Sequence, residues 1–481
     1  MVLAALDDAS LTASGYIYAT AISGYDGVSA AQAALVVGTY GASTVLSANV
    51  QADADSGDFG QSGAVGSQTL ASDGYAYLSS SYLISAWATS GYDGDSAALG
   101  AVVFGYYGAD AVNTGTIEAV ALSGDYGTSD ARGLQVFAVE GYASLYSSDL
   151  VYAYALSGFD GDAVAVAAQV VGPYGAETFN TGDIDAIALA GYNGTANAIG
   201  SITVSSLGDT YLYSSDSITA FAEAGDSASA QAAIAQAYGD ATSINSGDID
   251  AEAQADYGTA SALGILTSSQ NGTASLDNSG YVLAYANGYY GATAYGAFTL
   301  GDGYAYLSND GFIDVAAHAV LGNATGIGSL TTANLAYTYN EGSINALVST
   351  VVGNATANVV RNVWAYSIIF CGHFTADAEM FEDNLATETK AEWYLRQLKG
   401  SSNLTGGKIF HFMTGNLSHQ IEHHMFPDTP ANRYAEMAPK LRALCDEYGQ
   451  HYNTGSFSKQ FSEVMLRIAV HSLPNSVIGR A

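Results

Sequence analysis

Histidine is the residue type whose spacing in this sequence points most directly to chemistry. The chain has 8 histidines in 481 residues, and a cluster of them lies at His411, His419, His423 and His424. Neutral imidazole is the commonest protein ligand for transition metals, so the cluster predicts a metal site, with a histidine-rich surface as the alternative. If the segment is helical, His419 and His423 share one face because they lie four residues apart, and His424 flanks that face.

The residues around the cluster resemble a known family. Gln420-Ile421-Glu422-His423-His424, followed by Met425-Phe426-Pro427, is similar to the third histidine box of the membrane fatty acid desaturases, Gln-x-x-His-His. Further segments of this tail also resemble the family: Cys371-Gly372-His373-Phe374, Glu392-Trp393-Tyr394-Leu395-Arg396, Gly415-Asn416-Leu417 and Asn432-Arg433-Tyr434. The resemblance covers about 361–475 and is strongest to bacterial, actinobacterial-type acyl-CoA or acyl-lipid desaturases.

The resemblance implies a cofactor, a substrate and partners. In the family, histidines from three boxes hold two irons that activate dioxygen, and a ferredoxin- or cytochrome-type protein supplies electrons. The implied activity is acyl-CoA or acyl-lipid desaturation at a membrane. The resemblance implies His423 and His424 as iron ligands, His373 as a further ligand, and His419 or Asn416 as ligand or supporting residue.

Two departures from the family bear on activity. The first two boxes, His-x(3–4)-His and His-x-x-His-His, should lie upstream, but residues 1–360 contain only His318. The best candidate for a membrane span, from Trp364 to Phe374, is shorter than the roughly 20 residues that a bilayer-spanning helix needs. Because an incomplete ligand set binds iron weakly, we expect a desaturase by descent that is inactive as it stands.

Charge divides the chain into two regions. There are 12 Lys+Arg against 46 Asp+Glu, a formal net charge of -34, and Arg132 is the only basic residue before Arg361. This balance excludes general nucleic-acid binding, which requires clustered basic residues. We predict a Gly/Ala/Tyr/Asp-rich domain over 1–358 and a desaturase-like fragment over 361–481.

The first region is a repeat of 31–34 residues, in which an aliphatic anchor follows a polar cluster and begins an alternating alanine run. The anchors are Ile17, Val50, Ile84, Ile117, Leu150, Ile184, Ile218, Ile249, Val282, Ile313 and Ile344. Alternation predicts strands, and turns such as 191–194 (Gly-Tyr-Asn-Gly) are typical of tight strand connections. We therefore predict a mainly β protein, a β-solenoid of about eleven stacked units followed by a small helical segment, with one or two rungs per unit left open.

The polar, acidic and aromatic residues on the solenoid surface each allow two interpretations. Asparagines precede many anchors, and they predict a hydrogen-bonded ladder, with a ligand groove as the alternative. These asparagines are Asn113, Asn180, Asn245, Asn278, Asn309 and Asn340. The acidic Gly-Tyr-Asp-Gly turns favour a solvated surface over calcium binding, because the tandem calcium-binding nonapeptide is missing. Tyrosines at the turns favour ordinary strand surfaces over carbohydrate binding.

The repeat region also resembles the β-helical arrays of bacterial adhesins and autotransporter passengers. That resemblance implies a structural or adhesive role at the cell surface or in secretion. No signal peptide is recognisable, and the first residues fall inside a repeat unit, which suggests truncation at the N-terminus. A chimeric or truncated reading frame, joined near position 360, is a further alternative.

The tail is predicted to contain two amphipathic helices. The first has Thr429 as its N-cap and Pro430 at its first position, and it ends at Gly449. Its apolar stripe comprises Tyr434, Met437, Leu441, Leu444 and Tyr448. The second runs over 459–473 with a stripe of Phe461, Val464, Met465 and Ile468.

Overall fold

The computed structural model describes residues 2–3, 7–351, 355–357, 368, 371–373, 375, 378–379, 381, 388–414 and 416–472. The chain divides into two compact units, Met1–Asn358 and Val359–Ala481. Each unit has hydrophobic clusters of its own.

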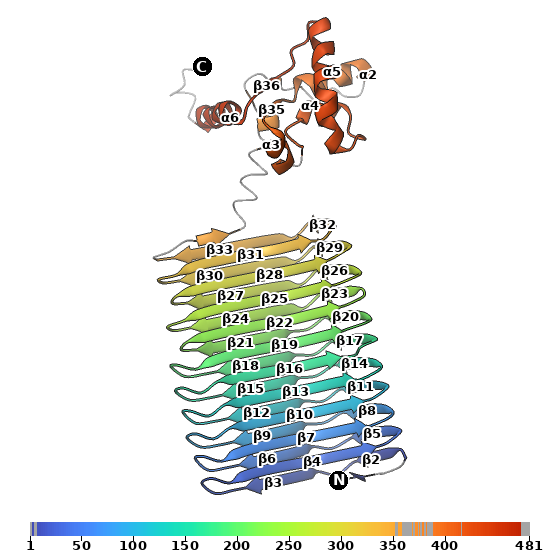
Figure 1. The fold of residues 1–481 in the computed structure, drawn as a ribbon, viewed down its shortest axis with the longest axis vertical. Coiled ribbons are helices and arrows are strands. Elements are labelled where there is room, and N and C mark those ends of the chain that lie inside the picture. The colour runs from blue at the N-terminus through green and yellow to red at the C-terminus, as the bar shows by residue number, and fades with distance from the viewer. Residues whose placement is uncertain are drawn as a thin grey trace. The chain divides into compact units, whose positions relative to one another are not determined.

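The N-terminal unit is a β-solenoid of three parallel sheets (Figure 1). The long-strand sheet contains β1 (Val2–Leu3), β4 (Val28–Gly38), β7 (Gln61–Ala71), β10 (Ser96–Gly105), β13 (Ser129–Ala138), β16 (Ala163–Val171), β19 (Thr195–Ser205), β22 (Ser227–Ala237), β25 (Thr259–Ser269), β28 (Gly291–Gly301), β31 (Asn323–Thr332) and β34 (Ala355–Ala357). The asparagine sheet contains β2 (Ala9–Ala13), β5 (Gly41–Leu46), β8 (Tyr75–Ser80), β11 (Gly108–Asn113), β14 (Tyr142–Ser147), β17 (Gly175–Asn180), β20 (Asp209–Ser214), β23 (Ala241–Asn245), β26 (Thr273–Asn278), β29 (Tyr304–Asn309) and β32 (Leu335–Asn340). The anchor sheet contains β3 (Ile17–Ile22), β6 (Val50–Asp55), β9 (Ile84–Thr89), β12 (Ile117–Leu122), β15 (Val151–Leu156), β18 (Ile184–Leu189), β21 (Ile218–Ala224), β24 (Asp248–Ala255), β27 (Tyr281–Gly288), β30 (Phe312–Ala319) and β33 (Ser343–Thr350).

The predicted fold class is confirmed: the protein is mainly β, with a solenoid of about 10 turns and a few C-terminal helices. Each repeat forms one coil of three strands, which settles the number of rungs per unit. Strands pair with the equivalent strand of the next coil, so β18 pairs with β15 before it and β21 after it. Since equivalent residues stack on one another, a single repeat cannot bury its own inner side and depends on its neighbours.

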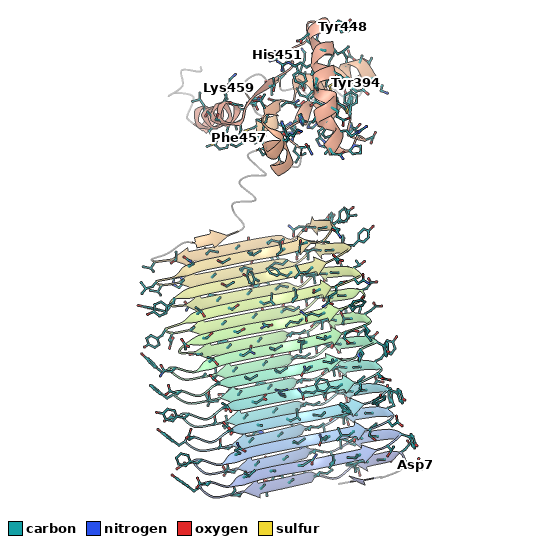
Figure 2. The ribbon with its side chains drawn as sticks, in the orientation of Figure 1. Asp7, Tyr394, Tyr448, His451, Phe457 and Lys459 are labelled. Atoms are coloured by element: carbon teal, nitrogen blue, oxygen red, sulfur yellow. The ribbon has the colours of Figure 1, made fainter. Side chains whose placement is uncertain are left out.

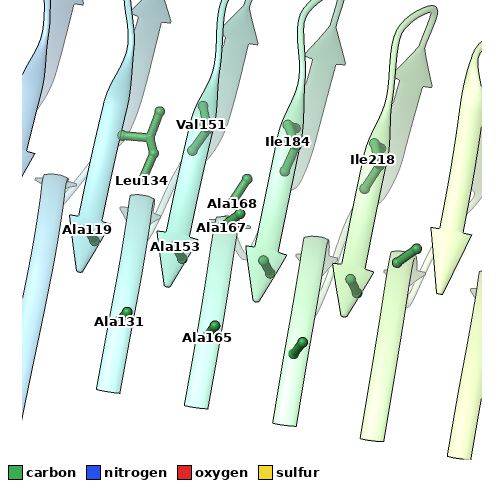
Figure 3. Close-up of a cluster of buried hydrophobic side chains, with 14 of the residues drawn as sticks. Ala119, Ala131, Leu134, Val151, Ala153, Ala165, Ala167, Ala168, Ile184 and Ile218 are labelled. Carbon is green, nitrogen blue, oxygen red and sulfur yellow. The ribbon is translucent and has the colours of Figure 1, made fainter. Parts of the chain in front are cut away.

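The anchors stack on one another in the core. Ile184 pairs in register with Val151 on one side and with Ile218 on the other, and all three are fully buried (Figure 3). The prediction of Leu150 as an anchor was wrong by one residue. Leu150 lies in the preceding turn, where its N–H donates to the Asp149 carboxylate, and Val151 takes the inward position.

Small residues leave room for these anchors. The side of the long-strand sheet that faces the core carries Gly66 opposite Ile84, and a Cβ added at Gly66 would lie 2.6 Å from the Ile84 Cγ2 atom. Alanine fills most other inward positions, as Ala119, Ala131 and Ala153 do (Figure 3). A thin coil with close sheet-to-sheet packing follows from this Gly/Ala lining.

The asparagine ladder is confirmed by its hydrogen bonds. Asn245 Nδ2 donates to Asn278 Oδ1 over 2.8 Å, Asn278 to Asn309 over 2.7 Å, and Asn309 to Asn340 over 2.6 Å. Earlier coils alternate asparagine with serine: Asn113 donates to Ser147 and Asn180 to Ser214. The ladder therefore provides hydrogen-bond partners for buried polar side chains along one edge, as the prediction of a hydrogen-bonded ladder requires.

The C-terminal unit is formed by short helices around two small clusters of buried side chains. Its elements are α2 (Lys390–Lys399), β35 (Asn403–Thr405), α3 (Lys408–Met413), α4 (Gln420–Met425), the 3-10 helix η2 (Ala431–Arg433), α5 (Tyr434–Glu447), β36 (Thr454–Ser456) and α6 (Phe457–Ser472). Thr389 caps α2 through reciprocal hydrogen bonds with Glu392, which is a capping box. Among the helices that the structure describes, none combines the length and apolarity required to cross a bilayer.

The predicted start of the first tail helix was wrong. Thr429 belongs to the preceding turn, since its N–H donates to the Phe426 carbonyl, and Pro430 precedes η2 rather than opening α5. Gly449 follows the end of α5 with a positive φ of 65°, which is the usual role of glycine after a helix.

The predicted stripe of α5 is only partly buried. Tyr434 and Leu441 are buried, but Leu444 is 52% exposed and Tyr448 is 68% exposed. Figure 2 labels the Tyr448 side chain near the end of α5. Cys445 is buried in their place. In α6, Val464 is buried and Met465 is exposed, while the Ile468 side chain lies outside the described residues.

Candidate metal centre in the C-terminal unit

Two of the predicted ligands face each other through the nitrogens that bind metals. His424 lies on α4, and its Nε2 is 3.3 Å from Nε2 of His373. The ring centroids are 4.7 Å apart with an interplanar angle of 84°. Two imidazole nitrogens on one tetrahedral ion, each at about 2.05 Å, are separated by roughly 3.3 Å. The geometry therefore fits two adjacent positions on a single ion.

The electrostatic surroundings keep both rings neutral. Burial, followed by the nearby His373 and His423 rings, lowers the pKa of His424 to about 4. Burial is also the main cause that lowers the pKa of His373, with a smaller contribution from His423. Since only neutral imidazole has a lone pair for a metal, both residues are in the correct protonation state at neutral pH.

The third residue of this group is His423. Its Nδ1 lies 3.2 Å from the hydroxyl of Tyr434, which is buried at the start of α5. Its ring centroid is 5.4 Å from that of His424. A hydrogen bond at Nδ1 fixes the ring orientation and makes Nε2 the nitrogen that could bind a metal.

His419 has a different environment from the one its spacing predicts. It lies just before α4, with φ of −103° and ψ of 58°, so it does not share a helical face with His423. Its ring stacks on His411 at 4.6 Å, and His411 Nδ1 is 2.7 Å from Ser418 Oγ. His419 Nε2 is buried without a hydrogen-bond partner in the described part of the chain. Burial and the His411 ring lower the pKa of His419 to about 4.

Asn416 shapes the turn before α4. It is the one described non-glycine residue with a positive φ, 61°, a conformation that asparagine tolerates better than most residues. Its N–H donates to the His411 carbonyl and its own carbonyl accepts from the His419 N–H. These two backbone hydrogen bonds form the turn that brings the His411 and His419 rings into contact. In this structure, Asn416 therefore contributes to the shape of the turn through its backbone.

A polar network that the sequence analysis missed holds α4 in place. The Glu422 side chain is fully buried, and its Oε2 accepts a 2.7 Å hydrogen bond from Asn403 Nδ2. Asn403 Oδ1 in turn accepts from the Ile421 N–H over 2.8 Å. Asn403 lies on β35, eighteen residues from Ile421, and no spacing rule links a strand asparagine to this helix. The one available signal was a glutamate inside an otherwise apolar and histidine-rich segment.

Two pockets open beside these residues. One of about 390 Å³ is lined by His411, His419, Arg442 and Tyr452 among others. Another of about 640 Å³ lies between α2 and the segment after α4, with Trp393, Tyr394, Met425 and Phe426 in its wall.

The donor set fits one ion better than two. His373 and His424 supply neutral nitrogens. In the described ranges of the C-terminal unit, no group of three or more His, Cys, Asp or Glu is close enough to hold a metal. The two facing nitrogens of His373 and His424 therefore fit part of one coordination sphere.

Comparison with known proteins supports the family resemblance of the tail. Residues 323–456 match the family model for fatty acid desaturases. The NADPH-dependent stearoyl-CoA 9-desaturase of Mycobacterium tuberculosis is 47% identical over 128 residues, which cover 26% of this chain and 30% of that protein. Fatty acid desaturase 3 of Bos taurus is 34% identical over 70 residues, covering 15% of this chain and 16% of that protein.

The C-terminal region is thus similar to the fatty acid desaturases, as its histidine box predicts. The chain spans about 30% of the length of the mycobacterial relative. No solved structure matches the chain significantly. The family match begins at Asn323, inside β31, so it overlaps the last coils of the solenoid as well as the helical unit.

Proposed function

We propose that the C-terminal unit is a desaturase-type metal-binding segment that holds one divalent transition-metal ion, iron in the family's chemistry, between His373 and His424. The observation that carries the proposal is the 3.3 Å separation of the two Nε2 atoms. We propose His423 as a further donor, which would have to move towards the ion, since its ring centroid lies 5.4 Å from that of His424. We retain His419 as a separate candidate ligand, because its buried Nε2 has no hydrogen-bond partner among the described residues, although its ring stacks on His411.

We further propose that the chain by itself does not desaturate acyl chains. Oxygen activation in this family needs two irons, each fixed by several imidazoles. Residues 1–360 offer only His318, which lies on the solenoid with its Nδ1 2.6 Å from Ser349 Oγ. For a complete site, the proposed substrate is a long-chain acyl-CoA, as the name of the mycobacterial relative suggests, or an acyl-lipid. The proposed electron donor is a ferredoxin- or cytochrome-type protein, as the resemblance to the desaturase family implies.

Metal titration tests this proposal. The full chain should bind one Co²⁺ or anaerobic Fe²⁺ per molecule, and His373→Ala and His424→Ala should each weaken binding at least tenfold. His451→Ala is the matched control, because His451 is an exposed histidine of the same unit. Equal binding by all variants would contradict the site. Two tightly bound irons, or unsaturated product from stearoyl-CoA that depends on His423, would contradict the inactivity.

A second candidate function belongs to the solenoid, which we propose as a structural or adhesive element of a cell-surface or secreted protein. It is favoured by the tyrosines that the asparagine sheet exposes, such as Tyr75, Tyr142 and Tyr304. Tyrosine offers a large contact area with a polar tip, which suits recognition of other molecules. Binding of the isolated protein to bacterial surface polysaccharides, compared with a Tyr142→Ser variant, would test that role.

A further inference from the structure

The outer side of the long-strand sheet carries aliphatic and aromatic side chains through many successive coils. Ile202, Ile234, Leu266, Phe298 and Leu330 are paired in register along β19, β22, β25, β28 and β31. Ile234 is nearly covered by its neighbours, whereas Ile202, Leu266 and Phe298 are partly exposed and Leu330 is 39% exposed. Earlier coils continue the same side with residues such as Phe104, which is 36% exposed.

This outer face is also almost free of charge, in contrast to the rest of the solenoid. From β4 to β31, the strands of the long-strand sheet contain one acidic and one basic residue, Asp130 and Arg132, which form an ion pair at 2.9 Å. Arg132 is also the only basic residue before Arg361. The anchor sheet, by comparison, carries Glu118 and Asp185 on its outer side. In a chain with a net charge of -34, a neutral apolar sheet face requires an explanation.

Four of the glutamines on the face are paired across coils. Gln32 Nε2 donates to Gln68 Oε1 over 2.7 Å, and Gln135 Nε2 donates to Gln169 Oε1 over 2.9 Å. Each pair bridges neighbouring coils along the solenoid. Burying these pairs against another surface would keep their hydrogen bonds, which lowers the desolvation cost, whereas the Asn197 side-chain oxygen on the same side has no partner in the described chain.

The size of the face suits a protein–protein interface. Strands of about 10 residues at roughly 3.3 Å each, and about 10 coils at roughly 4.8 Å each, give a face on the order of 1,500 Å², about half of which would meet the size of a stable interface. A stable interface buries about 800 Å² per partner. We propose that this face binds the same face of a second copy, so that the protein is a face-to-face homodimer through its solenoid. The inference does not depend on the proposed metal site.

A second copy fits the charges better than a lipid surface does. The flanking turns are acidic and would be repelled by anionic headgroups, whereas two neutral faces can meet with their acidic borders kept in solvent. The borders of the two copies still repel each other weakly. Dimerisation should therefore strengthen as salt concentration rises, because salt screens exposed charges.

Sedimentation equilibrium of the full chain tests the proposal. The expected mass is twice that of the 49.3 kDa chain. Ile202→Asp, which places a charge at the centre of the face, should raise the dimer dissociation constant about a hundredfold or more, since an unpaired buried charge is strongly unfavourable. Ile187→Asp is the matched control, because Ile187 lies on the outer side of the anchor sheet. It should leave the dimer intact.

Leu266→Asp provides an independent variant on the same face, and circular dichroism confirms which variants keep the β fold. A monomeric wild-type chain would overturn the proposal, whether the face is covered by the chain's own tail or binds phosphatidylcholine vesicles instead. Equal dimer dissociation constants for wild type, a folded Ile202→Asp variant and a folded Leu266→Asp variant would overturn it as well.

Discussion

The hydroxyl of Tyr452 donates a hydrogen bond of 2.6 Å to Oε1 of Glu422, thirty residues earlier in the chain. Asn403 Nδ2 also contacts this hydroxyl, at 2.6 Å, so both oxygens of the buried carboxylate are satisfied by side chains from two other segments. Burial and the adjacent Glu422 carboxylate raise the pKa of Tyr452. The Tyr452 hydroxyl therefore stays protonated and donates its hydrogen bond. Tyr452 and Asn403, which lie outside the histidine box, thus hold Glu422 of the box in place.

Replacing Tyr452 by phenylalanine should destabilise the C-terminal unit by about 1–3 kcal/mol, because one carboxylate oxygen of Glu422 loses its donor in a buried site. Urea unfolding followed by Trp393 fluorescence, in a chain with Trp87→Phe and Trp364→Phe, would measure the loss. Tyr448→Phe is the control, since Tyr448 is 68% exposed and should cost nothing measurable. Equal stability of the two variants would show that the network does not hold α4.

Acid should weaken the same unit in a defined range. The pKa of His419 is lowered to about 4, mainly by burial, whereas an unfolded histidine titrates near 6.5. Between pH 6.5 and about 4, His419 binds a proton in the unfolded state but stays neutral in the folded state. The free energy of unfolding therefore falls as the pH decreases towards 4. The full effect of this one residue is at most about 3 kcal/mol.

His373 and His424, whose pKa values are also lowered by burial, add to this acid sensitivity. The carboxylate of Glu422, 4.0 Å from His419 Nδ1, acts in the opposite direction. Urea unfolding at pH 7, 6 and 5 would measure the slope, and His419→Gln should make it shallower. A slope that His419→Gln leaves unchanged would contradict the assignment.

The asparagine ladder should be sensitive to the loss of one member. Asn278→Ala removes both the acceptor for Asn245 and the donor to Asn309, which should cost about 2 kcal/mol of solenoid stability. Asn278→Ser should cost less, because Ser147 and Ser214 occupy the equivalent position in earlier coils. Thermal unfolding followed by circular dichroism would compare the two. A larger loss for serine than for alanine would argue against the ladder.

Close contact between coils predicts a sharp difference between two glycines. A Cβ at Gly74 would overlap the carbonyl oxygen of Tyr40 in the preceding coil, whereas a Cβ at Gly63 would have no neighbour within 4 Å. Gly74→Ala should therefore cost about 2–3 kcal/mol, and Gly63→Ala should change stability by less than about 0.5 kcal/mol. Midpoints of thermal unfolding would show the difference, and similar midpoints would contradict it.

Much of the solenoid could be predicted from the sequence because its pattern is periodic and local. The anchors recur once per coil, each strand alternates, and asparagine or serine ends most strands of the asparagine sheet, so the stacking rule follows from the repeat itself. The single error, Leu150 in place of Val151, arose because two aliphatic residues are adjacent and only the turn geometry distinguishes them.

The candidate site was less predictable because it depends on contacts between distant segments. Helical spacing placed His419 beside His423, but α4 begins only at Gln420 and the turn at Asn416 stacks His419 on His411 instead. The pairing of His424 with His373 crosses 51 residues, and family resemblance rather than spacing indicated it. The apolar side chains on the outer side of the long-strand sheet were not predicted, because only the coil geometry shows which side of each strand faces outward.

The asparagine ladder has a direction as well as a pattern. From Asn245 to Asn340, each side-chain amide donates to the next coil towards the C-terminus, and Asn340 ends the row by donating to its own Gly342 carbonyl over 3.0 Å. Aligned amide dipoles add rather than cancel, as peptide dipoles do along a helix. Over these last coils the row of side-chain amides therefore has a local dipole along the solenoid axis, and its two ends differ electrically although each coil repeats the same residue.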